Sequence, residues 1–385
     1  MKIAFATTMH GAPWGGSEEL WSQAALRLQA AGHNVVASVP YWPQLSPRII
    51  ALSDRGVNVQ VRDAGPRTFS QRLLGKVNGR NPRSPEICWL QKHRPDLVVI
   101  SQGGYLDGLG WMQACRRQQI PFTPIVHCNT ETWWPNDELA LELAGAYGSA
   151  ERVFCVSRHN LELLERQIGQ RLPQAEIARN PYNVSPDRMT TWPASDQAWH
   201  VACVARLEPL HKGQDLLLQV LALPIWSGRP MHLHFYGNGP CEQSLRRMAD
   251  DLQLNHVHFH GHVPDVASIW EQNHLLVLAS RCEGTPIALV EAMWCSRPAV
   301  VTDVGGNAEM CLDGVTGFVA AAPTVALFDQ AMQRAWDQRQ QWQALGTAAR
   351  QRVEQLVGRD PVGDFCKQLL ACTAPHAPLA QAATR

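Results

Sequence analysis

The 385-residue sequence lacks features that would place it in several large classes of protein. No run approaches the roughly 18 apolar residues of a membrane-spanning helix. Lysine plus arginine and aspartate plus glutamate both total 34, so no basic excess points to a nucleic-acid partner. The eleven cysteines include no Cys-x-x-Cys pair, which favours reduced thiols in the cytoplasm over a disulfide framework.

Two motifs of nucleotide chemistry are also missing. The chain has no Asp-x-Asp, the motif that would hold a divalent metal on a diphosphate. Neither Gly15-Gly16 nor Gly237-Asn238-Gly239 completes Gly-x-Gly-x-x-Gly, because Glu242 stands at the third glycine's place in the second segment. A nicotinamide oxidoreductase is therefore disfavoured. The alternative role for Gly237 and Gly239 is an ordinary tight turn.

Short apolar runs alternate with helical periodicity in two stretches of the chain. Residues 1–185 and residues 201–350 each predict a doubly wound α/β domain built on a parallel sheet. The apolar start, Met1–Ala6, is too short for a signal peptide and predicts the first buried strand. Residues 186–200 have no periodicity and predict the linker between the two domains.

The end of the chain reads differently from the rest. Residues 351–370 predict a C-terminal helix, and residues 371–385 predict a disordered tail because prolines interrupt a run rich in alanine. Two doubly wound domains in series place a ligand-binding cleft between the carboxyl ends of their sheets.

The segment from Glu283 to Glu291 is the most informative of the chain. A short apolar run precedes it, and helical spacing follows Pro286, so we predict a strand, a turn and a helix. The amides of Ile287 and Ala288 would face an anion between the two carboxylates. Two carboxylates that bind hydroxyl groups, with a phosphate bound between them, are what a nucleotide-sugar site requires. Two acids on an ordinary surface helix would give the same spacing and are the alternative.

Arg206 and Lys212 follow the predicted strand at Val201–Val204. The forked guanidinium of an arginine and the compact ammonium of a lysine at the carboxyl end of a strand suit a diphosphate. Because the chain has no Asp-x-Asp motif to hold a metal, such fixed cations would have to stabilise the charge of the diphosphate. Solvated surface charges are the alternative. Gly16, at the start of the first predicted helix, would add a backbone amide close to a ligand.

His127 ends the predicted strand Pro124–Val126. It suits either a half-buried histidine or a group in the cleft opposite Glu283. Trp133 and Trp134 follow it and suit either stacking on an acceptor sugar or a place in the seam between the domains.

Two further patterns favour ordinary surface roles. Four histidines alternate along one predicted strand, and because parallel side chains do not converge on a metal we predict a polar strand face. They are His256, His258, His260 and His262. The segment Ala64–Pro85 has cations but no acid and predicts either a solvated loop or a peripheral contact with anionic lipid at the inner membrane face. Its cations are Arg67, Arg72, Lys76, Arg80 and Arg83.

Taken together, these segments resemble the retaining GT-B glycosyltransferases of family four. The resemblance covers most of the chain, and the order and spacing of its short motifs are specific. The motifs are Gly15-Gly16-Ser17-Glu18, Ala31-Gly32-His33, Arg94-Pro95-Asp96, Val156-Ser157, Val204-Ala205-Arg206-Leu207 with Lys212-Gly213, Tyr236-Gly237-Asn238-Gly239, Phe259-His260-Gly261, Glu283 to Glu291, Gly305-Gly306-Asn307 and Gly314-Val315-Thr316-Gly317. One departure is Asn180-Pro181-Tyr182-Asn183, where the family often has Asn-Gly-Val-Asp.

The resemblance implies two Rossmann-like domains facing across a cleft, with the final helix crossing back onto the first domain. It implies retaining transfer from a nucleoside diphosphate sugar, such as a UDP- or GDP-sugar, to a glycan or lipid-linked acceptor, without metal or other cofactor. An epimerase of the same fold and a non-catalytic nucleotide-sugar-binding subunit are the alternatives.

The resemblance also implies roles for single residues. His127 and Glu283 would contact the transferred sugar, and His127 would support positive charge at the anomeric carbon. The diphosphate would lie against Gly16, Arg206, Lys212, Ile287 and Ala288. The nucleoside would lie against the Val263 backbone and Glu291. We expect Glu18, Trp133 and Trp134 on the acceptor side.

Overall fold

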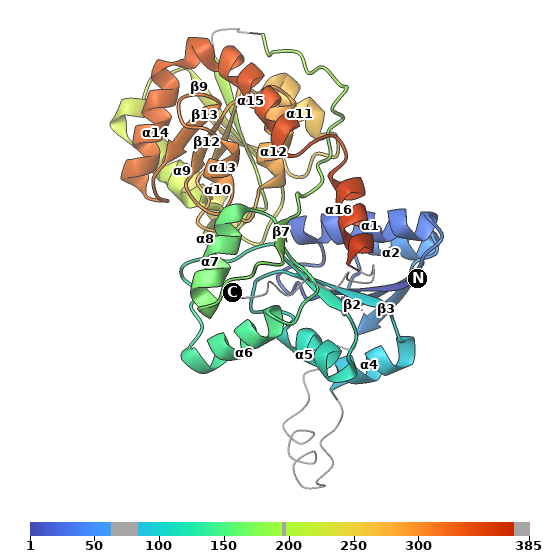
Figure 1. Cartoon of the computed structure of the whole chain (residues 1–385). Helices are drawn as coiled ribbons and strands as arrows, with labels where there is room; N and C mark the ends of the chain where they lie inside the picture. Colours follow the sequence, from blue (N-terminus) through green and yellow to red (C-terminus); the bar gives the residue numbers. More distant parts are fainter. Residues whose placement is uncertain (63–83, 195–197, 373–385) are drawn as a thin grey trace, which may run out of the picture.

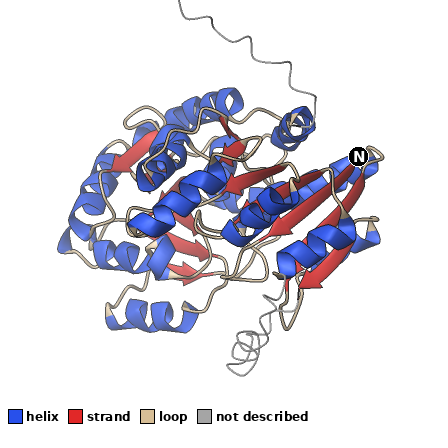
Figure 2. Ribbon diagram, turned by 60° about the horizontal axis from the view of Figure 1, so that its bottom comes forward, coloured by secondary structure: helices blue, strands red, loops and turns tan. Residues whose placement is uncertain are grey.

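The computed structural model describes residues 1–62, 84–194 and 198–372 of the chain. It contains two parallel β-sheets, each belonging to its own half of the sequence (Figure 1). Helices cover both sheets, as Figure 2 shows. This arrangement confirms the predicted fold class of two Rossmann-like domains. The cationic segment from Arg67 to Arg83 and residues 373–385 of the predicted tail lie outside the described residues.

The first sheet has seven strands in the order β3-β2-β1-β4-β5-β6-β7. They are β1 Lys2–Thr7, β2 Asn34–Pro40, β3 Asn58–Arg62, β4 Leu97–Gln102, β5 Phe122–Val126, β6 Val153–Cys155 and β7 Ala175–Ile177. The accompanying helices are α1 Gly16–Ala30, α2 Pro47–Asp54, α4 Pro85–His93, α5 Leu109–Gln118, α6 Asp137–Tyr147 and α7 Arg158–Ile168. Central strands such as β4 are buried along their whole length, because helices cover both faces. Ser157 caps α7, its hydroxyl accepting a hydrogen bond of 3.1 Å from the Asn160 amide.

The second sheet has six strands in the order β10-β9-β8-β11-β12-β13. They are β8 Trp199–Val204, β9 Met231–Tyr236, β10 Val257–Phe259, β11 Leu275–Leu278, β12 Ala299–Thr302 and β13 Gly317–Ala320. The helices are α8 Pro209–Lys212, α9 Gln214–Leu221, α10 Glu242–Asp251, α11 Val266–Gln272, α12 Ile287–Trp294, α13 Asn307–Met310, α14 Val325–Asp337 and α15 Trp342–Leu356, with 3-10 turns at Pro224–Trp226 and Arg339–Gln341. The turn after β11 and the helix α12 therefore lie where the spacing around Pro286 predicts them.

The structure corrects two predicted boundaries. The linker predicted over 186–200 runs into β8, because Trp199 and His200 pair with Met231 and His232 of β9. The domain end predicted at residue 350 falls inside α15, which packs along α12 and so belongs to the second domain. The helix predicted over 351–370 is consequently two helices, separated by a turn with Gly358 at a φ of 72°.

The last helix, α16 Pro361–Ala371, packs in the first domain beside α1 (Figure 1). The Phe365 ring meets Phe154 of β6 edge-on, with centroids 5.1 Å apart. At the start of α16, Arg27 Nη1 lies 2.6 Å from a carboxylate oxygen of Asp360. The chain therefore crosses between the domains twice, once before β8 and once before α16.

Candidate active site

The turn after β11 inserts into the first domain where the two sheets face each other. Gly284 approaches His127 so closely that a methyl group on it would lie 1.9 Å from the His127 carbonyl oxygen. The Thr285 hydroxyl donates a 2.9 Å hydrogen bond to the Val156 carbonyl, and the Asn180 amide donates one of 3.3 Å to the Thr285 carbonyl. Only glycine fits at position 284, and the predicted cleft residues of the two domains meet here.

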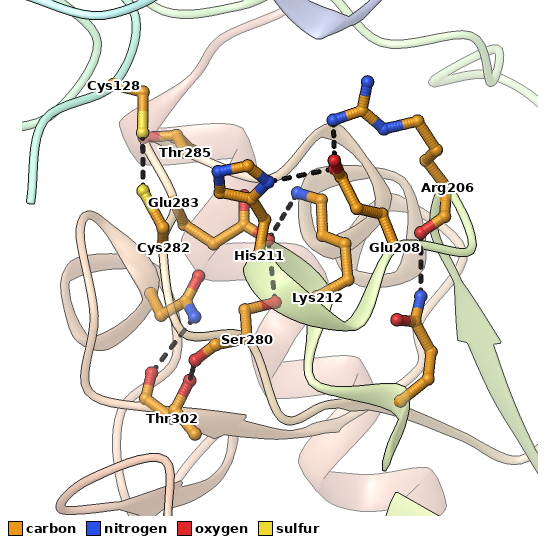
Figure 3. Close-up of polar contacts among 12 residues, drawn as sticks. Cys128, Arg206, Glu208, His211, Lys212, Ser280, Cys282, Glu283, Thr285 and Thr302 are labelled. Atoms are coloured by element: carbon orange, nitrogen blue, oxygen red, sulfur yellow. Dashed lines mark hydrogen bonds and ion pairs between the residues drawn. The ribbon is translucent and has the colours of Figure 1, made fainter. Parts of the chain in front are cut away.

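Lys212 and Glu283 form an ion pair in this seam (Figure 3). Glu283 Oε1 accepts hydrogen bonds from Lys212 Nζ at 2.7 Å and from the Ser280 hydroxyl at 2.8 Å. Only 23% of the Lys212 side chain and 6% of the Glu283 side chain are exposed. Burial alone would lower the pKa of Lys212, but the Glu283 charge and hydrogen bond raise it above its usual value. A fixed positive charge therefore lies beside a buried carboxylate.

Arg206 lies close to Lys212 in the chain but pairs with a different acid. Its guanidinium donates to Glu208 Oε2, and His211 Nδ1 lies 2.9 Å from the same oxygen (Figure 3). A methyl group on Gly11 would lie 3.8 Å from Arg206 Nη1, so this cation faces the loop after β1 of the first domain. The two predicted diphosphate ligands thus both lie near the seam of the domains, each held by its own carboxylate.

His127 is buried at the end of β5. Its Nε2 lies 3.2 Å from the Ser101 hydroxyl, whereas its Nδ1 makes no well-aligned hydrogen bond with any residue that the structure describes. Burial lowers the pKa of His127 to about 3, and the nearby Asn180 side chain opposes this effect only in part. The imidazole is therefore neutral at physiological pH, and its Nδ1 is buried without a well-aligned partner among the described residues.

The start of α12 faces the glycine loop of the first domain. Ile287 and Ala288 are its first residues, so their amides have no carbonyl one helical turn earlier to bond. A methyl group on Gly16 would lie 3.5 Å from Ile287 Cδ1, which brings the starts of α1 and α12 together. Two helix starts at one seam favour an anion between them.

Glu291 is buried one turn further along α12 and contacts the connection between the domains. Its Oε1 accepts hydrogen bonds from the Asn183 amide at 2.8 Å and from Asn183 Nδ2 at 2.9 Å. Burial raises the pKa of Glu291 to about 7, although both hydrogen bonds act in the opposite direction. Val263 lies beyond β10, the outermost strand, where it packs partly buried against the core of the second domain.

The three residues expected on the acceptor side lie in two places. The Glu18 carboxylate accepts hydrogen bonds from Thr7 Oγ1 at 2.6 Å and Trp21 Nε1 at 2.7 Å, and burial raises its pKa to about 7. It lines a pocket of the first domain together with Met9 and Trp42.

Trp133 and Trp134 lie on the loop before α6 and are 39% and 60% exposed. The Trp133 ring meets His211 of the second domain edge-on, with centroids 6.3 Å apart. Trp133 therefore spans the seam, and Trp134 extends towards solvent.

Three residues of the site were not predicted from the sequence. Ser280 orients Glu283, Asn183 binds Glu291, and Ser101 contacts His127. Ser101 and Asn183 act across 26 and 108 residues of chain. Ser280 stands three residues before Glu283, and that spacing alone could have suggested it.

The predicted histidine face is shorter than the sequence suggested. Only His258 lies within β10, because the chain turns at Gly261, where φ is 71°. His258 pairs with His232 across the strands at 3.0 Å, and His260 with His234 at 2.9 Å. In the described ranges no group of three or more His, Cys, Asp or Glu side chains is placed to hold a metal ion. Over the same residues, no helix is both long and apolar enough to cross a membrane.

Two family profiles match the chain, one for each domain. The family described as "Glycosyl transferases group 1" matches residues 189–352, and "Glycosyltransferase Family 4" matches residues 14–193.

Among curated relatives, the D-rhamnosyltransferase WbpZ of Pseudomonas aeruginosa is 30% identical over 151 residues, which are 38% of each chain. A GDP-mannose-dependent alpha-(1-6)-phosphatidylinositol monomannoside mannosyltransferase of Mycolicibacterium smegmatis is 32% identical over 194 residues, which are 44% of this chain and 49% of that protein. The chain thus matches less than half the length of these two relatives.

Solved structures match over almost the whole chain. Anabaena Alr3699/HepE in complex with UDP and glucose has a TM-score of 0.73 at 20% identity, covering 98% of this chain and 100% of that one. Sucrose-phosphate synthase from Thermosynechococcus elongatus has a TM-score of 0.70 at 19% identity, covering 96% and 100%. At these identities the likeness establishes a shared fold.

Proposed function

The chain belongs to the GT-B glycosyltransferases of group 1 and family 4, and from this premise we propose that it transfers a sugar from a nucleoside diphosphate sugar to an acceptor hydroxyl. The observation that carries the proposal is the ion pair of half-buried Lys212 with buried Glu283 at the seam of the domains. A cation for a phosphate and a carboxylate for sugar hydroxyls lie within one hydrogen bond of each other.

The donor's diphosphate binds between the cations and the helix starts. Lys212 and Arg206 provide charge from one side, and the amides of Ile287 and Ala288 provide hydrogen-bond donors from the other. These groups stabilise the leaving diphosphate, so the reaction needs no metal ion. Relatives named for GDP-mannose and structures with UDP or UDP-glucose support a nucleotide-sugar donor.

The sugar lies between His127 and Glu283. The buried Nδ1 of neutral His127 lacks a hydrogen-bond partner among the described residues, and a sugar hydroxyl that reaches it would supply one and let the imidazole support charge at the anomeric carbon. Glu283 accepts hydrogen bonds from sugar hydroxyls and is itself held by Lys212 and Ser280. An oxocarbenium-like transition state follows, with retention at the anomeric carbon, and the acceptor's proton passes to a donor phosphate oxygen.

The acceptor approaches from the first domain. The pocket that Glu18 lines and the exposed Trp134 give it a hydrogen-bond acceptor and an aromatic surface. Both suit a glycan, and Trp134 also suits the apolar part of a lipid-linked acceptor.

A donor-binding screen followed by a transfer assay tests the proposal. A nucleoside diphosphate that binds the folded chain stabilises it by about 2.7 kcal/mol at a concentration one hundred times its Kd, and the thermal midpoint rises accordingly. We expect one of UDP and GDP to do so, and the matching sugar donor to lose its sugar only when an acceptor is present, with EDTA changing nothing. Glu283→Gln should lose transfer, whereas the matched control Glu242→Gln, on the surface helix α10, should keep it.

Two results would contradict the proposal. One is the absence of stabilisation by any nucleoside diphosphate or its sugar. The other is conversion of the donor sugar without an acceptor, which would indicate an epimerase.

A further inference from the structure

Two cysteines from different domains touch beside the candidate site (Figure 3). Cys128 follows His127 in the first domain, and Cys282 precedes Glu283 in the second. Their sulfur atoms lie 2.9 Å apart, although the residues are 154 positions apart in the chain. A disulfide bond measures about 2.05 Å, so a small side-chain movement would join them.

The backbone around the pair explains the contact. Gly284 packs on the His127 carbonyl, and the Cys282 amide donates to the His211 carbonyl at 3.2 Å. Both cysteines are therefore held in place by neighbours that already touch across the seam. The short distance does not depend on long, mobile side chains.

Core packing accounts for most of the other cysteines but not for these two. Seven of the eleven belong to the apolar clusters of the domains: Cys115, Cys155, Cys203, Cys295, Cys311, Cys366 and Cys372. Cys128 and Cys282 lie outside those clusters in the described part of the chain, and Cys128 is partly exposed. Cys128 is therefore the member of the pair that a small oxidant would meet first.

We propose that Cys128 and Cys282 are a modification site at which a peroxide forms a reversible disulfide between the two domains. The Cys128 thiol is first oxidised to a sulfenic acid, and the peroxide is reduced to water or an alcohol. The Cys282 sulfur then attacks the Cys128 sulfur, a second water leaves, and the S–S bond forms. Two thiols lose two electrons in total, which the peroxide takes up, and a dithiol returns them.

The disulfide would act on the site because of where it lies. It joins the residue after His127 to the residue before Glu283, so it fixes the two segments between which the donor sugar would have to pass. This consequence, loss of transfer, rests on the proposed function, whereas formation of the bond does not.

Oxidation of the purified full chain tests the proposal. After hydrogen peroxide and a thiol-blocking reagent, mass spectrometry without reductant should find one cross-linked peptide containing Cys128 and Cys282, lighter by two hydrogens than its halves. Contact with Cys282 and burial raise the pKa of Cys128 well above its usual range, so thiolate is scarce and the peroxide is used in excess. Dithiothreitol should remove the cross-link and restore transfer together.

Variants separate this bond from other oxidation. Cys128→Ser and Cys282→Ser should each abolish the cross-link and keep transfer active under peroxide. Cys88→Ser, at an exposed cysteine outside the site, should leave both the cross-link and the inactivation unchanged. If one serine variant does not fold, the other gives the same information.

Three outcomes would overturn the proposal. They are absence of the cross-link when Cys88 is fully modified, a cross-link with undiminished transfer, and inactivation that persists in both serine variants. Because the cross-link is read by mass, it can be found even if the chain transfers no sugar. Failure of the proposed sugar transfer is thereby distinguished from failure of the proposed disulfide.

Discussion

Replacing Lys212 with methionine removes the positive charge beside buried Glu283 but keeps most of the side chain's length. Glu283 would retain the Ser280 hydrogen bond and lose its charged partner. Breaking a buried pair on one side costs about 3–5 kcal/mol, and because Lys212 is 23% exposed we expect the lower end, about 3 kcal/mol. For a domain of this size the thermal midpoint should fall by roughly 6–12 °C.

The measurement is thermal unfolding of the full chain, followed by calorimetry. Lys367→Met is the matched control, since its pair with Asp364 is exposed on α16, and its melting should match wild type.

A double-mutant cycle makes the reasoning refutable. Lys212→Met combined with Glu283→Gln leaves no unpaired charge, so it should be less destabilised than the sum of the two single changes. Additive effects, or a Lys212→Met variant that melts with wild type, would show that the pair contributes no coupling energy.

Three further predictions concern other parts of the molecule. His127→Ala should lower kcat by about 10²–10³ while the thermal midpoint stays near wild type, and an unchanged kcat would remove His127 from the reaction. Burial raises the pKa of Glu291 in the folded state to about 7 from 4.5, so its contribution to stability is full below about pH 4.5 and is lost as the pH rises through 7. The urea midpoint of Glu291→Gln should therefore decline less than that of wild type between these two pH values. An identical decline in both proteins would contradict the assigned cause. Phe365→Ala should destabilise the first domain by about 3–5 kcal/mol in urea unfolding, because the ring is fully buried against Phe154, and a loss confined to the second domain would contradict the packing of α16.

Local sequence patterns predicted the elements that carry the site. The apolar run of β11, the turn at Pro286 and the start of α12 lie where predicted, because their signals are contained within a few residues.

Partners distant in the chain escaped prediction, because periodicity reports only which face of an element is buried. Neither the Asn183–Glu291 hydrogen bonds nor the Cys128–Cys282 contact has a local signature. The predicted linker wrongly included the first two residues of β8 for a related reason. His200 is polar but meets His232 on a face of the sheet that is half-buried, so the strand lacks a continuous apolar run.

The position of α16 affects the order in which the chain can fold. Its apolar residues complete the core that contains β1 and α1, which are translated more than three hundred residues earlier. During synthesis this apolar core of the first domain therefore stays incomplete until α16 has emerged from the ribosome. Such a nascent intermediate is prone to aggregate, and a chaperone that covers the incomplete core until α16 has emerged would be expected to improve the yield of folded protein.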